Sequence, residues 1–106
     1  MNEKDELLQF RAKIFKALAD PLRLKILQFL GTGEKCVCEI IPELDVVQPL
    51  VSRHLGILKK NGLIIDRKEG NKRFYSITDL RILKIIEDIS PDMQEKISQL
   101  IIQLLV

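Results

Sequence analysis

The sequence predicts a mainly α-helical domain that carries one small β-hairpin. Apolar residues recur at helical spacing over most of the chain, and a Gly-Asn pair separates two β-prone runs. Asp-Pro and Ser-Pro pairs mark two helix starts. With 106 residues, 46% of them hydrophobic and 30% charged, the chain is expected to form a single domain with one core.

The first half is predicted to hold three helices before the centre of the chain. Residues 5–19 form the first, and Asp20 is expected to cap the second, with Pro21 in its first position. The second helix runs to residue 30 and is predicted to be the most buried. Residues 35–38 are expected to be extended, and 39–44 to form a short helix, which tolerates Pro42 only near its start.

Residues 46–61 are predicted to form a helix with two chemically different faces. One arc is apolar: Val47, Leu50, Val51, Leu55, Ile57 and Leu58. The other carries Gln48, Pro49, Ser52, Arg53, Gly56, Lys59 and Lys60. Amide, hydroxyl and guanidinium groups read base edges, and a helix fits the major groove of DNA. A solvated amphipathic helix is the alternative. His54 falls within the apolar arc, where we expect a partly buried packing residue.

A basic hairpin is predicted directly after this helix. Its strands are residues 63–68 and 72–77, and its basic residues gather towards the tip. Residues 48–76 hold seven basic and two acidic residues, a net charge of +5, so the remainder of this +2 chain carries −3. An oriented site for a polyanion is therefore expected. We interpret 38–61 as a helix-turn-helix and 63–77 as its wing.

The two terminal regions carry more apolar surface than a domain of this size needs for its own core. The last two predicted helices begin at Thr78 or Asp79 and at Ser90-Pro91. We therefore expect residues 4–19 and 79–106 to pair with a second copy of the chain, as a homodimer.

Several classes of function are not supported. The acidic start, MNEKDELL, is unlike a signal peptide, and the longest apolar tract, 97–106, is too short to span a bilayer. A cytoplasmic protein without a membrane partner is expected, with reduced cysteines. One histidine and no nucleophile–base set argue against an enzyme, and no cofactor is required.

Three motifs resemble the ArsR/SmtB family of transcriptional repressors. Residues 18–27 read LADPLRLKIL, residues 51–58 read VSRHLGIL before Asn61-Gly62-Leu63, and residues 70–77 read GNKRFYSI. They resemble the family's opening motif, recognition helix and wing, in the same order. The resemblance implies a dimeric winged-helix repressor that binds an imperfect palindrome of double-stranded DNA and is released by an inducer.

The segment 34–40, EKCVCEI, resembles the cysteine box of family members that respond to arsenic, antimony, cadmium or lead. This resemblance implies that Cys36 and Cys38 bind a soft ion as inducer. The position of the third arsenic thiolate is occupied by Ile41. The two cysteines are therefore interpreted either as a sensor or as small buried hydrophobic residues. A redox switch is a further alternative, although a disulfide between residues this close in sequence is expected to be geometrically awkward.

The predicted contacts with DNA divide into two groups. Gln48, Ser52 and Arg53, with the adjacent Pro49, are candidates for base contacts. Candidates for phosphate contacts are Lys59, Lys60, Arg67, Lys68, Lys72 and Arg73. The function predicted from these features is that of a DNA-binding repressor released by a soft ion. One alternative is a regulator without metal sensing, with a thiol-redox or another inducer, and another is a winged helix used as a protein-interaction module.

Overall fold

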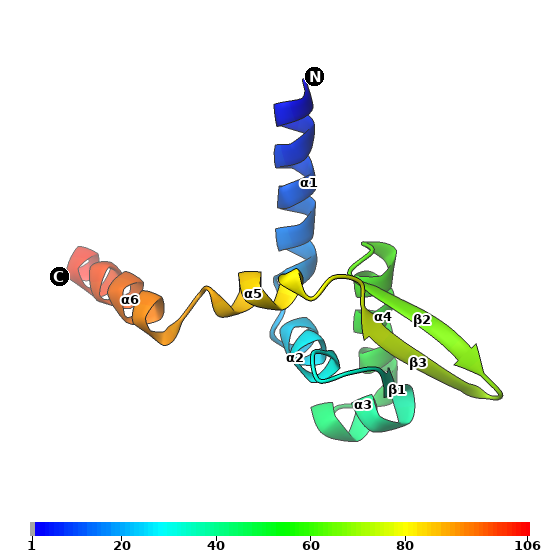
Figure 1. Ribbon diagram of the computed structural model, residues 1–106. Helices are drawn as coiled ribbons and strands as arrows, with labels where there is room; N and C mark the ends of the chain where they lie inside the picture. The colour runs from blue at the N-terminus through cyan, green and yellow to red at the C-terminus, as the bar shows by residue number, and fades with distance from the viewer. Residues whose placement is uncertain (1) are drawn as a thin grey trace.

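Six helices and three short strands make up the computed structural model, which describes residues 2–106. In chain order they are α1 (Glu3–Leu18), α2 (Pro21–Leu30), β1 (Lys35–Cys36), α3 (Val37–Leu44), α4 (Gln48–Lys60), β2 (Ile64–Glu69), β3 (Lys72–Ile77), α5 (Arg81–Glu87) and α6 (Pro91–Leu105). Figure 1 shows α2 to β3 gathered in one body, from which α1 and α6 project in different directions. The predicted winged helix-turn-helix architecture is confirmed.

The core is built around α2, which contacts α1, α3, α4, α5 and β3. Its residues Ile26 and Leu27 are completely buried. Further fully buried side chains come from α2 itself, α3, α4 and β2: Leu30, Ile40, Val51, Leu58 and Ile64. Because these side chains pack together in one core, they fix the orientation of α4 relative to α2, α3 and β2.

Two predicted helix starts are confirmed. Asp20 caps α2, because its Oδ1 accepts hydrogen bonds from the backbone N–H groups of Leu22 at 2.8 Å and Arg23 at 3.4 Å. Ser90 caps α6, and its Oγ accepts a hydrogen bond from the N–H of Met93 at 3.1 Å. The helix α5 differs from the prediction: its N-cap is Leu80 rather than Thr78 or Asp79.

The sheet has one strand more than predicted. Its order is β1-β3-β2, with all neighbours antiparallel. The hairpin closes through the pair Glu69–Lys72, and Gly70 takes the left-handed φ of 62° that the turn between them needs. The added strand β1 pairs Lys35 with Tyr75 and Cys36 with Phe74. Two residues carry too little pattern to reveal a strand in sequence.

The short helix α3 begins two residues earlier than predicted, so Val37 and Cys38 are helical rather than extended. The cause is the cap. The backbone N–H of Cys36 donates to Glu39 Oε1 at 3.0 Å, and the N–H of Cys38 donates to Cys36 Sγ at 3.0 Å. Pro42 consequently lies inside the helix instead of near its start, which corrects the prediction.

The turn between α3 and α4 depends on one residue. Asp45 has a φ of 53°, and its backbone N–H donates to the carbonyl of Ile41 at 3.2 Å. Aspartate tolerates this left-handed conformation better than most side chains do. The reversal lets α4 begin three residues later, at Gln48, so that α3 and α4 form a helix-turn-helix.

The projecting helices bury little of their apolar surface. Only Ala17 and Leu18 are buried in α1, and no residue is buried in α6. A groove of about 590 Å³ lies where α1 meets α5 and the end of α4, lined by side chains that include Phe10, Ile14, Phe15 and Ile85. Within residues 2–106, no helix has the length and apolar character needed to cross a bilayer.

Candidate nucleic-acid interface

The helix α4 divides into a packed face and an open face. Its buried residues are Val51, His54, Leu55 and Leu58. All seven residues predicted for the polar face are exposed: Gln48, Pro49, Ser52, Arg53, Gly56, Lys59 and Lys60. One member of the predicted apolar arc departs from it, because Val47 is the N-cap and is 69% exposed. The polar face can therefore meet another molecule along the whole helix.

At Gly56 the open face of α4 carries no side chain, so another molecule can approach the helix backbone closely there. A Cβ added at this position would meet no atom of the described chain within 4 Å. Arg53 lies one turn before it and has no recorded ion pair or hydrogen bond in the part of the chain that the structure describes. Its guanidinium therefore keeps all its donors for a ligand, which is the state that recognition of a guanine edge needs.

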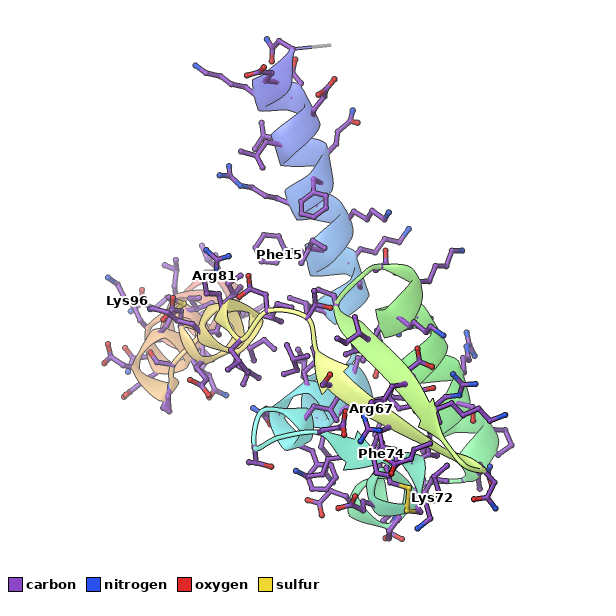
Figure 2. All side chains as sticks on the ribbon, turned by 45° about the vertical axis from the view of Figure 1, so that its right-hand side comes forward. Phe15, Arg67, Lys72, Phe74, Arg81 and Lys96 are labelled. Atoms are coloured by element: carbon purple, nitrogen blue, oxygen red, sulfur yellow. A yellow bond between two sulfur atoms is a disulfide. The ribbon has the colours of Figure 1, made fainter. Side chains whose placement is uncertain are left out.

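The wing carries its basic residues in two different states. Arg67 donates to Glu34 Oε2 at 2.9 Å and to Glu69 Oε2 at 2.7 Å. Its guanidinium also lies 4.7 Å from the ring centre of Phe74. Figure 2 shows Arg67 and Phe74 together on the sheet, with Lys72 further towards the hairpin tip. Its hydrogen bonds to Glu34 and Glu69 raise the pKa of Arg67 above its already high ordinary value.

Asp66 holds two more of the basic candidates. Lys59 Nζ lies 3.0 Å from Asp66 Oδ1, and Arg73 donates to Asp66 Oδ2. These hydrogen bonds, the one from Arg73 first, lower the pKa of Asp66 below its ordinary value. Among the described residues, Lys60, Lys68 and Lys72 have no recorded ion pair.

Sequence reasoning missed these carboxylate partners. Asp66 and Glu69 lie in the basic segment itself, but a count of charges does not reveal which side chains meet. Glu34 lies 33 residues before Arg67 and reaches it only because β1 joins the sheet. Three of the six predicted phosphate contacts are thus ion-paired within the chain, and three are open.

His54 anchors α4 to the corner between α1 and α2. It is 7% exposed, which confirms the packing position predicted for it. Its Nδ1 lies 3.2 Å from an Arg23 nitrogen and its Nε2 lies 3.8 Å from Asp20 Oδ1. Since arginine only donates, Nδ1 is the acceptor in the contact with Arg23.

Arg23 also secures the end of α1. Its Nε donates to the carbonyl of Ala17 at 2.6 Å. Burial raises the pKa of Asp20, but the backbone hydrogen bonds of Leu22 and Arg23 outweigh it, so that the pKa lies below its ordinary value. This contact set, which sequence periodicity could not reveal, connects α1, α2 and α4 through polar atoms.

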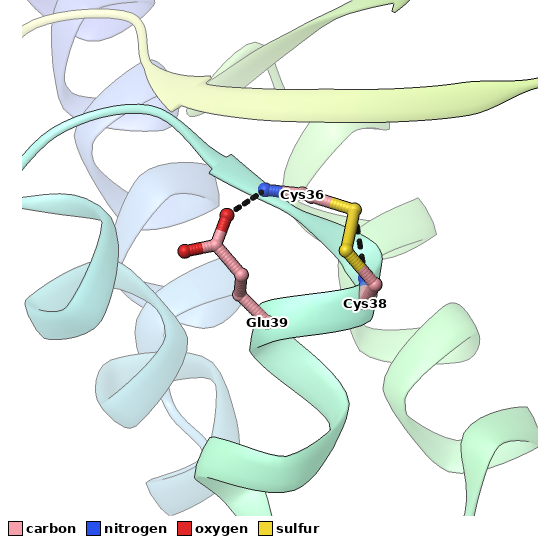
Figure 3. Close-up of a disulfide and its surroundings, with 3 residues drawn as sticks. All are labelled: Cys36, Cys38 and Glu39. Carbon is pink, nitrogen blue, oxygen red and sulfur yellow. Dashed lines mark hydrogen bonds between the residues drawn. A yellow bond between two sulfur atoms is a disulfide. The ribbon is translucent and has the colours of Figure 1, made fainter.

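The cysteine pair lies at the junction of the sheet and α3. Cys36 is 4% exposed and Cys38 is exposed, and a disulfide joins them (Figure 3). This bridge differs from the expectation of reduced cysteines, and it forms although only one residue separates the pair. The extended Cys36 turns directly into the first turn of α3, which brings the two Cα atoms to 5.1 Å, inside the usual range for disulfides.

When reduced, this pair can offer two sulfur ligands to a soft ion. No group of three or more His, Cys, Asp or Glu side chains within residues 2–106 is arranged to hold a metal. Among the described residues, the donors for a soft ion are therefore limited to the two sulfur atoms, which fit such an ion only in part.

Comparison with known proteins decides the family. Residues 20–66 match the family described as "Bacterial regulatory protein, arsR family". An arsenical resistance operon repressor of Escherichia coli is 39% identical over 93 residues, which span 84% of this chain and 80% of that protein. The chain belongs to the arsR family of bacterial regulatory proteins. It is a winged-helix, DNA-binding transcription regulator, and the family is one of regulators rather than enzymes.

Further similar proteins agree with this assignment. An uncharacterised HTH-type transcriptional regulator of Methanocaldococcus jannaschii is 53% identical over 77 residues, covering 72% of this chain and 86% of that one. The homodimeric winged helix-turn-helix domain of a possible ArsR-family regulator from Mycobacterium bovis, solved by NMR, is 30% identical with a TM-score of 0.78 and covers 91% of this chain and 92% of that chain. Reduced HlyU from Vibrio cholerae has a TM-score of 0.74 at 30% identity, over 84% of this chain and 94% of that chain.

Proposed function

We propose that this arsR-family chain is a homodimeric repressor that binds an imperfect palindrome upstream of its own gene. The observation that carries the proposal is the fully exposed polar face of α4 beside a basic wing. Gln48, Ser52 and Arg53, next to Pro49, supply the base contacts. Lys60, Lys68 and Lys72 are the open phosphate contacts, and Lys59, Arg67 and Arg73 contact phosphates from within their ion pairs. DNA as partner implies a cytoplasmic location.

The second copy covers the apolar surfaces of α1 and α6. Exposed apolar side chains follow each helix on the side that the chain itself leaves open, among them Phe10, Phe15, Ile97 and Leu100. We assign residues 4–19 and 79–106 to dimerisation, 38–61 to the helix-turn-helix and 63–77 to the wing. Two such copies would place their α4 helices in successive major grooves, about 34 Å apart.

A mobility-shift titration on the upstream region tests the repressor. Wild type should bind the upstream duplex more tightly than a scrambled duplex of equal length, and binding should weaken steeply as salt rises. Equal affinity for both duplexes at every salt concentration would exclude a sequence-specific repressor and favour a protein-interaction module.

A soft ion is the first candidate inducer. Similarity to an arsenical resistance operon repressor supports it, together with the two neighbouring sulfur atoms. The ion would bind the reduced pair Cys36 and Cys38, with a third ligand from the partner subunit, a small thiol or water. Its pull on the cap of α3 would shift the support of α4, since these helices pack together.

A thiol-redox inducer is the second candidate, and the disulfide favours it. Exchange with an oxidised small-molecule disulfide would join Cys36 Sγ to Cys38 Sγ. The two protein thiols would lose two electrons and two protons, and the small disulfide would leave as two thiols.

One experiment separates the two inducers. Arsenite or cadmium should release operator DNA from reduced wild type but not from Cys36→Ser, which keeps a polar cap on α3. Release by oxidised glutathione alone, reversed by a reductant, would assign the redox switch instead. Release of both proteins by an ion would show that the ion acts elsewhere, and the cysteines would then have no sensing function.

A further inference from the structure

Asp66 is placed between the DNA-facing helix and the wing. It lies on β2, which contacts both α4 and β3. Its side chain is 10% exposed, whereas those of its partners Lys59 and Arg73 are 51% and 46% exposed. Lys59 belongs to the last turn of α4 and Arg73 to β3. One nearly enclosed carboxylate therefore holds two surface cations on two different elements.

We propose that Asp66 restrains Lys59 and Arg73 and thereby increases the preference of the protein for its operator over other DNA. This inference rests on the proposed function as an operator-binding protein. We name the three side chains Asp66, Lys59 and Arg73 the Asp66 clamp.

The charge of the Asp66 clamp supports this role. Two cations around one carboxylate leave a net charge of +1 rather than +2. Non-specific binding depends on how many cations can each neutralise a phosphate and release a counterion. The Asp66 clamp lowers that number on every DNA sequence, so it weakens binding to the large excess of wrong sites.

The geometry of the clamp acts in the opposite direction on the operator. Lysine and arginine side chains lose rotamer freedom when they bind, and a side chain already held in place loses less. The carboxylate keeps Lys59 and Arg73 at fixed positions on either side of it. A DNA backbone that follows the shape of the surface meets both groups, whereas a misaligned backbone meets neither. Restraint therefore reduces non-specific affinity more than operator affinity.

The open lysines provide the internal contrast. Lys60 and Lys72 lie next to the clamped residues in sequence, yet neither has a recorded ion pair within residues 2–106. They can follow any phosphate backbone. Asp66 thus holds one basic residue on α4 and one on the wing, whereas the neighbouring lysines are not held.

The test is the variant Asp66→Asn with Asp88→Asn as its matched control. Asp88 also forms an ion pair with a lysine, Lys84, at 3.2 Å. It is exposed at the end of α5, on the polar side of this helix and not on the apolar side that we assign to dimerisation. The helix α5 lies away from the wing (Figure 1). Both variants raise the net charge by one. Fluorescence anisotropy with the upstream duplex and with a scrambled duplex, over a series of salt concentrations, measures both affinities and both salt slopes.

Asp66→Asn should tighten binding to the scrambled duplex roughly five- to tenfold at about 0.1 M salt, the factor that one more phosphate contact supplies, and steepen its salt slope by ~0.9. Affinity for the upstream duplex should change by less than that factor, so the specificity ratio falls. Asp88→Asn should change neither ratio nor slope.

Two results would overturn the inference. In the first, Asp66→Asn behaves as Asp88→Asn does. In the second, folded Asp66→Asn loses operator affinity without gaining affinity for scrambled DNA, which would mean that Asp66 only builds the surface. If Asp66→Asn fails to fold, Asp66→Thr, with a β-prone residue, takes its place. Failure of wild type to prefer its operator would refute the proposed function instead.

Discussion

The helices α4 and α6 have similar patterns of polar and apolar residues, but α4 packs into the core whereas α6 projects from it. Both are amphipathic, and both carry a proline in the first turn. Four residues of α4 are buried, whereas none of α6 is. An apolar stripe thus shows that a helix needs a partner, but not where the partner is. For α4 the partner is the core of the same chain, and for α6 we propose a second chain.

The largest expected effect comes from breaking the α6 interface. Ile101→Glu should convert the dimer to a monomer and lower operator affinity on the order of 10²- to 10⁴-fold, because the two half-sites are no longer bound together. Analytical ultracentrifugation and anisotropy measure both changes.

The control for this variant is Ile102→Glu, on an exposed residue about 100° further around α6. It should leave the dimer intact. Circular dichroism of Ile101→Glu should stay that of a folded protein, because α6 buries nothing in its own chain. Unfolding of Ile101→Glu would break the comparison between the two helices.

The packed face of α4 should respond through stability instead. Leu58→Ala opens a cavity at a completely buried side chain and should lower the free energy of unfolding by ~2–5 kcal/mol. Denaturant titration at constant protein concentration measures it. Ile102→Ala, at an exposed residue, should change the free energy little. An equal loss in both variants would mean that Ile102 of α6 is packed as tightly as Leu58 of α4.

The open face of α4 should respond through binding. Arg53→Ala should lower operator affinity by about 1–3 kcal/mol without changing the free energy of unfolding, because Arg53 is exposed. Lys25→Ala removes one positive charge from an exposed position of α2, outside the segments assigned to DNA binding and dimerisation, and serves as control. Should Lys25→Ala weaken binding as much as Arg53→Ala, the effect of Arg53 would be one of net charge alone.

The smallest expected effect concerns α5, which connects the two regions. The side chain of Arg81, then its backbone N–H, binds Asp79 and lowers the pKa of its carboxyl from the ordinary 3.8 to about 2. Because the pKa is lowered in the folded state, the Asp79–Arg81 interaction contributes fully to stability above pH ~4, and this contribution is lost as the pH falls through about 2. NMR titration should find the midpoint near 2 in wild type and a higher one in Arg81→Gln, which loses the guanidinium but keeps the backbone N–H hydrogen bond. Equal midpoints would contradict this pairing.

Much of the fold could be predicted because its signals are local. Asp20 and Ser90 each reach a backbone N–H two or three residues away, and Gly70 completes a two-residue turn. Such contacts join residues that are close in the sequence, so short sequence motifs predict them. The strand β1 could not be predicted, since its partner β3 lies 40 residues further along the chain, at Tyr75 for Lys35.

The candidate site could be predicted in composition but not in pairing. Helical spacing placed Arg53 and Ser52 on the open face and His54 on the packed face. It could not show that Arg67 meets Glu34, because that contact depends on strand register. Nor could it show that Cys36 caps α3 and is bridged to Cys38, which depends on the change of direction at the cap.

The pairing of β1 with β3 has a consequence for the order of folding. The hairpin pair Glu69–Lys72 closes a very short loop, whereas β1 forms only two pairs, which span 40 and 38 residues. Because closing the longer loop costs more entropy, β1 is expected to join the sheet after the hairpin has formed. A segment with so few ladder bonds is also expected to open first in the native protein. Hydrogen exchange should thus be faster at Lys35 and Cys36 than along β2, and the cysteines would become accessible without unfolding the rest of the domain.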